Sequence, residues 1–260
     1  MLNLETEKEK QDFRRYVFAH NTKLRNYLNV EIEKYLNKLY NDIAKAADKG
    51  SLLDYEWYIK NRFAELQEIL KTFYIRMAAN WIATVESDLE QVSPKNFIRY
   101  EKKGFTDSFW AVFLTWLGRE SVKRASLILR TTRLAISHII SNGLRNGFSF
   151  TQISGEIRRI GGIRIPSRAM RIAQTEAHTA YSSSTHHMML NSRMVQEKEW
   201  GAVMDAKTRD PHAIANGQRV PISQPFFVGG EQLMYPGDPA GSPENTIHCR
   251  CVVSYYTYRS

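Results

Sequence analysis

The chain has 260 residues, of which 43% are hydrophobic and 24% are charged, a composition typical of a folded protein rather than of a disordered one. The formal net charge is +9, but the excess is local. Residues 101–170 carry 12 basic and 4 acidic side chains, while the residues before and after them are almost neutral. A positive surface over the whole protein, as a general binder of nucleic acid or membrane would carry, is therefore not expected.

Several other classes of protein lack support in the sequence. No run of about 18 apolar residues is present, so no helix is expected to span a bilayer. Residues 1–10 are charged and lack the apolar core of a secretory signal. The two cysteines, Cys249 and Cys251, are two positions apart and cannot provide a disulfide framework that holds a fold together. We expect the chain to be made in the cytoplasm.

The first half of the chain predicts long helices. Residues 9–49 contain neither Gly nor Pro, and their apolar side chains recur at spacings of three, four and seven. Gly50 ends this pattern, and a capping-box sequence at 51–54 indicates a second helix that runs to about residue 90. A third helical pattern covers residues 105–140.

The second half changes in character. A short helix is predicted at 151–160, Gly161-Gly162 is expected to break it, and Pro166 is expected to begin a helix that runs to about Leu190. Short apolar segments then alternate with turn residues, which predicts antiparallel strands at 199–203, 225–228, 232–235 and 251–256.

These elements predict an α+β fold with two domains. Residues 1–145 would form an elongated helical N-terminal half, which we expect to be the docking region. Residues 146–260 would form a compact C-terminal domain, in which one or two helices pack on short antiparallel strands.

The helix predicted from Pro166 places a carboxylate among small apolar residues. On a helical wheel, Ala169 and Ala180 share one face with Glu176. A buried carboxylate needs a partner, and Arg209 is the preferred one because a guanidinium can bind a carboxylate through two hydrogen bonds. We expect this pair to hold the helix to the sheet. Catalysis by Glu176 as a general acid or base is the alternative, because burial raises the pKa of a carboxyl group.

A polar loop follows the first predicted strand. Asp205 at the end of that strand, followed by Thr208 and Arg209, is expected to cap a turn. His212 is expected to be a hydrogen-bonded structural residue, with a metal ligand or a general base as the alternatives.

The last predicted strand begins with two cysteines. On a strand, Cys249 and Cys251 point to the same side, and Arg250 points to the other. The two thiolates together with His212, or with Asp205, could bind zinc in a tetrahedral site. Buried inert thiols and a redox pair are the alternative interpretations.

Five motifs follow one another between about residues 145 and 252. They are Asn146–Ile153; the helix Arg168-Ala-Met-Arg171-Ile-Ala-Gln-Thr175-Glu176; Trp200 with Asp205, Thr208, Arg209, His212 and Gly217; Phe226-Phe227 with Tyr235-Pro-Gly-Asp-Pro239; and Asn245 with Cys249-Arg250-Cys251. In this order they resemble the Mu F-like head morphogenesis proteins of tailed phages. Gln174 departs from the pattern, since the family usually has Arg there.

The resemblance implies a minor head protein of the phage capsid. Such a protein is incorporated in few copies during procapsid assembly, is associated with the portal protein, and acts in head assembly and in DNA packaging or ejection. The expected partners are the portal protein and the major capsid or scaffolding protein, and the expected location is the head interior or the portal vertex of the virion. No catalytic residue, no cofactor and no membrane contact is implied, so the motif residues are expected to hold the fold.

The basic segment suggests a further partner. Its side chains could contact the phosphates of packaged double-stranded DNA without reading sequence, or could pair with an acidic protein surface. The candidate residues are Lys102, Lys103, Lys123, Arg124, Arg130, Arg133, Arg158, Arg159 and Arg164.

An enzyme is the alternative function. A small nuclease or transferase could use Glu176, Arg209 and His212, with or without a metal. Against it, the sequence has no evident paired acidic cluster for two-metal catalysis and no glycine-rich phosphate loop. A cellular DNA-binding regulator is a third reading, but no helix-turn-helix or zinc-finger signature is recognisable. The structural, non-enzymatic reading is preferred.

Overall fold

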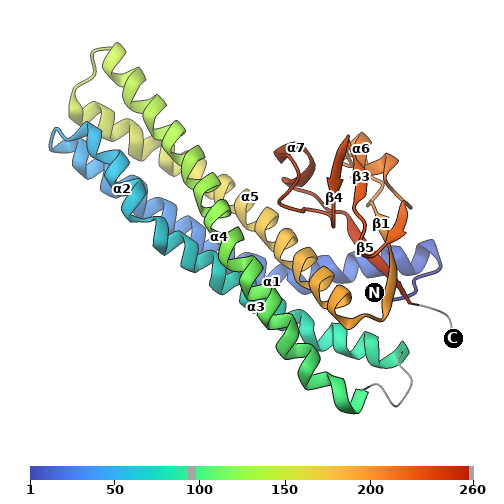
Figure 1. The fold of residues 1–260 in the computed structure, drawn as a ribbon. Helices are drawn as coiled ribbons and strands as arrows, with labels where there is room; N and C mark the ends of the chain where they lie inside the picture. The colour runs from blue at the N-terminus through green and yellow to red at the C-terminus, as the bar shows by residue number, and fades with distance from the viewer. Residues whose placement is uncertain (93–97, 258–260) are drawn as a thin grey trace. The chain divides into compact units, whose positions relative to one another are not determined.

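The computed structural model describes residues 1–92 and 98–257, without the side chains of Leu53 and of residues 92–105. Four long helices dominate it (Figure 1). They are α1 (Glu7–Asp48), α3 (Phe63–Val92), α4 (Ile98–Arg145) and α5 (Phe150–Ser192). The short elements are η1 (Leu52–Asp54), α2 (Tyr55–Asn61), α6 (Asp210–Ile214), α7 (Pro243–Thr246), β1 (Val195–Gly201), β2 (Arg219–Pro221), β3 (Phe226–Val228), β4 (Glu231–Leu233) and β5 (Val252–Thr257). The predicted α+β class is confirmed.

The connection after α1 differs from the predicted capping box. Ser51 makes no side-chain cap hydrogen bond, and the chain continues through the 3-10 turn η1. The predicted second helix is also divided, because α2 ends at Arg62, whose backbone N–H donates to Tyr58 O. The Arg62 carbonyl accepts a hydrogen bond from Tyr35 Oη at 3.0 Å. A side chain of α1 therefore stabilises the turn between α2 and α3.

Helix α5 is continuous, so the predicted break at Gly161-Gly162 and the new helix at Pro166 were wrong. Pro166 lies inside α5, where it removes one backbone donor without ending the helix. A Cβ atom at Gly161 would lie 2.9 Å from Cδ1 of Tyr40 on α1. This glycine therefore allows close packing of α5 on α1 rather than a break in the chain.

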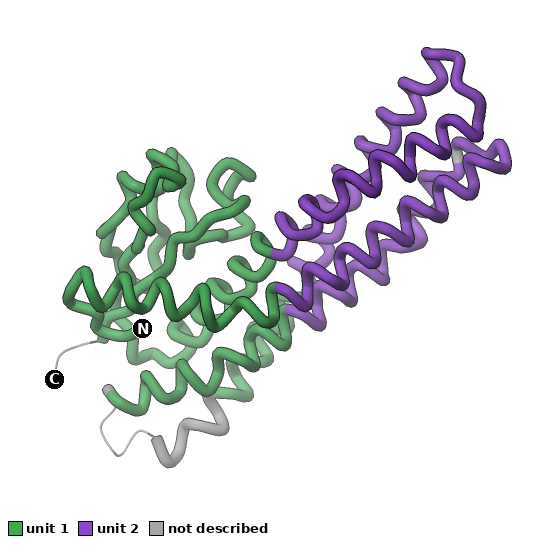
Figure 2. Tube along the Cα trace, turned by 180° about the vertical axis from the view of Figure 1, so that it is seen from behind, with its two compact units in different colours: residues 1–25, 74–117, 174–260 green, residues 26–73, 118–173 purple. Residues whose placement is uncertain are grey.

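The residues form two compact units, drawn in different colours in Figure 2. Unit 1 contains residues 1–25, 74–117 and 174–260, and unit 2 contains residues 26–73 and 118–173. Each of the four long helices contributes residues to both units. The domain boundary at 145/146 stays a prediction; it coincides with the end of α4 at Arg145.

Unit 2 is an elongated helical bundle (Figure 2). Its core consists of apolar side chains from α1, α3, α4 and α5, including Leu36, Leu66, Leu70, Ile136 and Ile157, all fully buried. The unit carries 18 basic and 10 acidic side chains, a net charge of +8 out of the +9 of the whole chain. The charge excess is therefore a property of this bundle.

Unit 1 contains all the strands. β1 pairs antiparallel with both β2 and β5, in the order β2-β1-β5, and β3 pairs antiparallel with β4. Leu2 adds a parallel bridge to Tyr255 of β5. Four predicted strands are confirmed with shifted ends, whereas β2 and the short helices α6 and α7 were not predicted.

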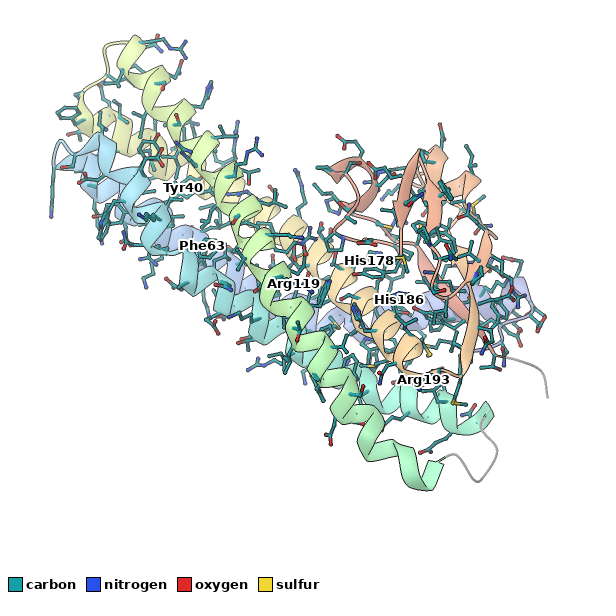
Figure 3. The ribbon with its side chains drawn as sticks, viewed as in Figure 1. Tyr40, Phe63, Arg119, His178, His186 and Arg193 are labelled. Atoms are coloured by element: carbon teal, nitrogen blue, oxygen red, sulfur yellow. The ribbon has the colours of Figure 1, made fainter. Side chains whose placement is uncertain are left out.

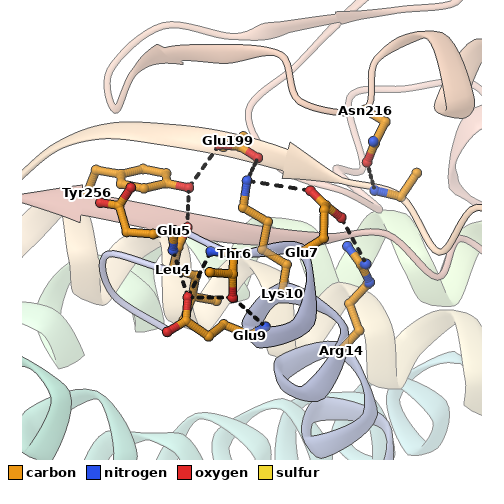
Figure 4. Close-up of polar contacts among 11 residues, drawn as sticks. Leu4, Glu5, Thr6, Glu7, Glu9, Lys10, Arg14, Glu199, Asn216 and Tyr256 are labelled. Carbon is orange, nitrogen blue, oxygen red and sulfur yellow. Dashed lines mark hydrogen bonds and ion pairs between the residues drawn. The ribbon is translucent and has the colours of Figure 1, made fainter.

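A charged cluster joins the start of α1 to the sheet (Figure 4). Lys10 Nζ lies 2.5 Å from Glu199 Oε1, and Tyr256 Oη lies 2.8 Å from Glu199 Oε2. The same hydroxyl lies 2.9 Å from Leu4 O. Since Glu199 and Tyr256 are buried, these contacts fix the position of α1 against β1 and β5.

The two adjacent glycines of α5 generate a matched prediction. Gly161→Ala places a methyl group against the buried Tyr40 ring, and we expect unit 2 to lose about 1–3 kcal/mol of unfolding free energy. A Cβ atom at Gly162 would have nothing within 4 Å. Gly162→Ala should therefore raise the unfolding free energy by up to about 1 kcal/mol, because alanine has a higher helix propensity than glycine. Urea unfolding followed by circular dichroism measures both. Equal effects of the two substitutions would contradict the packing role of Gly161.

Lys198 on β1 generates a prediction about pH. Its side chain is fully buried, its Nζ donates to Met234 O at 2.7 Å, and Nζ lies 5.0 Å from the centroid of the Phe226 ring. Burial lowers the pKa of Lys198 from 10.5 to about 7. Between these two pKa values the unfolded chain holds a proton that the folded protein has released. The unfolding free energy should therefore rise with pH in that window.

We expect Lys198→Met to flatten this rise, which has a slope of at most about 1.4 kcal/mol per pH unit for one group. Urea unfolding at pH 7, 8 and 9 measures it, with the exposed Lys60→Met as the control. An identical pH dependence of Lys198→Met and the unsubstituted protein would show that Lys198 does not carry the effect.

Candidate functional site

The C-terminal half of α5 is the centre of unit 1. Between Ala173 and Met189, all side chains except Gln174 and His187 are buried. Ala169, Glu176 and Ala180 are buried as predicted, and Ala173, Thr175 and His178 are buried as well. The helix is therefore enclosed on all sides here, and its polar side chains require partners inside the protein. Figure 3 labels two of them, His178 and His186.

Glu176 and Arg209 have other partners than the predicted ones. Tyr74 Oη of α3 donates to Glu176 Oε2 at 2.8 Å. Arg209 forms the N-cap of α6 and donates through Nη2 to Ile247 O. Glu176 thus joins α5 to α3, and Arg209 holds the turn that precedes Cys249.

The loop after β1 is organised by Asp205, as predicted. Asp205 Oδ1 accepts from Lys207 N at 2.9 Å, and Thr208 Oγ1 lies 3.2 Å from Asp205 N. Arg250 donates to both Asp205 oxygens, at 2.7 and 2.5 Å. This guanidinium, together with the turn hydrogen bonds, holds the pKa of Asp205 well below its usual range. Because the pair is exposed, it adds little to the unfolding free energy of the protein. It holds the loop after β1 against the residues before β5.

His212 lies beside both cysteines. It is 2% exposed, and its Nδ1 lies 3.3 Å from Cys251 Sγ and 3.7 Å from Cys249 Sγ. The Trp200 ring packs edge-on against the imidazole, with ring centroids 5.6 Å apart. The predicted alternation is confirmed, because both thiols are buried while Arg250 reaches Asp205.

The two thiols have opposite pKa shifts. Burial acts to raise the pKa of Cys249, but the hydrogen bond with Cys251 and the nearby His178 and His212 hold it well below its usual value. The pKa of Cys251 is raised well above its usual value by the hydrogen bond with Cys249 and by burial. The pair therefore favours one thiolate next to two imidazole rings.

Two cavities border this cluster. One of about 10 Å³ is lined by Arg209, His212 and both cysteines, among others. A second of about 420 Å³ is lined by the basic residues Arg25, Lys207, Arg209 and Arg250, among others, and by no acidic residue; His178 also lines it. Glu176 lines neither cavity. The three residues of the enzyme hypothesis therefore do not meet at either of these cavities.

The other motif residues have structural surroundings. Arg168 Nη2 donates to Ile128 O at 2.8 Å and to Thr131 Oγ1 at 2.7 Å within unit 2, and burial lowers its pKa. Arg171 is exposed. Thr175 Oγ1 accepts from His248 N at 3.4 Å, and Trp200 is fully buried. Gly217 has φ +79°, a conformation that favours glycine in the turn before β2.

Many of the candidate basic residues form ion pairs within unit 2. The pairs are Lys123–Glu120 (3.7 Å), Arg133–Glu56 (2.6 Å), Arg158–Asp48 (2.5 Å) and Arg159–Glu156 (2.7 Å). Arg124 is buried, whereas Arg130 and Arg164 are exposed. The side chains of Lys102 and Lys103 lie outside the described residues.

Sequence reasoning missed Tyr74 and His178. Tyr74 lies on α3, 102 residues before its carboxylate partner. His178 is beside Cys249 only because α5 packs against the loop that contains the cysteines. The pattern around His178 indicated a helix, but nothing in it indicated which loop the helix would meet.

Comparison with known proteins agrees with this arrangement. Residues 134–254 match the model of the family described as Phage Mu protein F like protein, a range that includes all of α5 and strands β1–β4. The chain is similar to the uncharacterized protein YqbB of Bacillus subtilis (strain 168), with 21% identity over 255 residues, 94% of this chain and 80% of that protein. No solved structure gives a significant match.

The resemblance to the Mu F-like family is therefore confirmed. It indicates a phage head morphogenesis protein and, with that, a structural role in the virion head. None of the helices in the described part of the chain is long and apolar enough to cross a membrane.

Proposed function

We propose that this protein is a minor head protein of a tailed phage that docks on the portal protein and acts in head assembly and in DNA packaging or ejection. The match of residues 134–254 to the Mu F-like family carries the proposal. The protein would be made in the host bacterial cytoplasm and reside in the head interior or at the portal vertex. The major capsid or scaffolding protein would be its second protein partner.

Unit 2 offers a surface suited to docking. Leu127 and Leu134 on α4 are 52% and 61% exposed, although they are large apolar side chains. Lys123 and Arg130 are exposed on the same face, since the four positions follow one another at helical spacings of four, three and four. Exposed leucines flanked by cations fit a partner surface that has an apolar centre and a charged rim.

Co-purification with the portal protein of the same phage tests this docking. We expect the unsubstituted chain to co-purify, and the double variant Leu127→Glu, Leu134→Glu to bind at least about tenfold more weakly, because two charges would be buried at the interface. Ile214→Glu, at an 85% exposed position in unit 1, is the control and should bind normally. Failure of the unsubstituted chain to co-purify with the portal protein would contradict the docking proposal. Full binding by the double variant would show that Leu127 and Leu134 do not form the docking surface.

We further propose that unit 2 contacts packaged double-stranded DNA without sequence preference. Its net charge of +8 supports this, together with the exposed Arg130 and Arg164. The exposed ion pairs of Arg133, Arg158 and Arg159 cost little to exchange for phosphate contacts.

Binding to purified duplex DNA across a salt series measures this contact. The logarithm of the association constant should fall linearly with the logarithm of the salt concentration, and Arg130→Gln with Arg164→Gln should reduce the slope by about 2. The exposed pair Lys8→Gln with Lys23→Gln in unit 1 is the matched control. Binding that does not depend on salt would contradict phosphate contact and favour an acidic protein surface as the partner of unit 2.

A further inference from the structure

We propose that Cys249, Cys251 and His212 bind one zinc ion, with His178 of α5 as the fourth ligand. This structural metal site goes beyond the proposed function and does not depend on it. The ligand atoms of the first three residues lie within 4.8 Å of one another, and all three residues are buried. They come from α6 and from the segment before β5.

The distances fit a tetrahedral ion. With Zn–S near ~2.3 Å and Zn–N near ~2.0–2.1 Å, each S···N edge of the tetrahedron measures about 3.6 Å. The two distances from His212 Nδ1, 3.3 Å to Cys251 Sγ and 3.7 Å to Cys249 Sγ, lie on either side of this value. The two distances therefore fit two edges of the coordination tetrahedron, and all three atoms lie within 4.8 Å of one another.

His178 completes the set of ligands. It is 8% exposed, and its Nε2 is buried without a hydrogen-bond partner in the described part of the structure. His178 and Cys249 line the same cavity of about 420 Å³. Gly237 makes room for the ring: its φ is +76°, and a Cβ atom there would lie 2.9 Å from His178 Cδ2. The hydrogen bond from Thr179 Oγ1 to Gly237 O, 3.0 Å long, holds this glycine against α5 (Figure 3 labels His178).

The chemistry of the cluster favours zinc over inert thiols. Two thiolates and two neutral imidazoles are a frequent ligand set for structural zinc, and their charge balances that of the ion. A void of about 10 Å³ lies beside His212 and the two cysteines. Trp200 Nε1 is buried without a hydrogen-bond partner in the described part of the structure, and the Trp200 ring packs edge-on against His212, which places an N–H donor beside the cluster. Four protein ligands leave no open position, so the ion would cross-link α5, α6 and the start of β5 rather than catalyse.

Metal analysis of the full chain tests the site. The protein is purified under reducing conditions, exposed to Zn²⁺ and freed of loosely bound metal by gel filtration. We expect one zinc per chain, and X-ray absorption should show a shell of two sulfur and two nitrogen ligands with Zn–S near ~2.3 Å. Replacement by Co²⁺ should give the intense visible bands of tetrahedral cobalt with thiolate ligands. These readouts need no variant.

Variants then assign the ligands. Cys249→Ser and His178→Gln should each weaken zinc binding at least about 100-fold, because each removes a direct ligand. His138→Gln, an exposed histidine on α4 in unit 2, is the matched control and should bind one zinc normally. Less than a tenth of a zinc per chain in the unsubstituted protein would overturn the proposal. Undiminished affinity in His178→Gln would overturn the four-ligand site.

Discussion

The burial of α5 from Ala173 to Met189 is the constraint on which the rest of unit 1 depends. A helix enclosed on all sides cannot leave its polar groups to water. Ser184 and Thr185 donate to carbonyl groups of the helix itself, and other polar groups bond to neighbouring segments. Tyr74 contacts Glu176, His248 N contacts Thr175, and Gly237 O accepts from Thr179. Gly237 belongs to one of the motifs that resemble the Mu F-like family and His248 lies beside the last of them, whereas Tyr74 lies outside the motifs.

The same constraint explains the loops after β1. Phe226, Val228 and Leu233 are fully buried there, and polar contacts between the loops act together with this packing. Asp205 and Arg250 tie the loop after β1 to the chain before β5, and Arg209 holds the turn at Ile247. These contacts bring His212, Cys249 and Cys251 together within one small volume. A zinc ion bound there would replace the weak contacts of the thiol groups by metal–ligand bonds, and these bonds would cross-link His212, Cys249 and Cys251 to α5.

The features that could be predicted from the sequence are those that depend on the local pattern of apolar and polar residues. The extent of α1, the positions of four strands, the burial of Glu176 and the opposite directions of Cys249 and Arg250 all follow from periodicity. Contacts between distant segments did not follow. Gly161 and Pro166 indicated a break, because a pattern cannot show that Gly161 faces Tyr40 across a helix pair. His178 and Tyr74 were missed for the same reason, since their partners lie 71 and 102 residues away.

Unit 2 differs from unit 1 in its chemistry: it holds nearly all of the net charge and exposes leucines on α4. This division fits our proposal that the helical bundle of unit 2 meets the partners of the protein. The most direct test of the account is the number of copies of this chain per mature phage head, determined by quantitative mass spectrometry against the portal and major capsid proteins. We expect a few copies per head, on the scale of the portal and far below the major capsid protein. Absence from purified heads and their assembly intermediates, or an abundance equal to that of the major capsid protein, would contradict it.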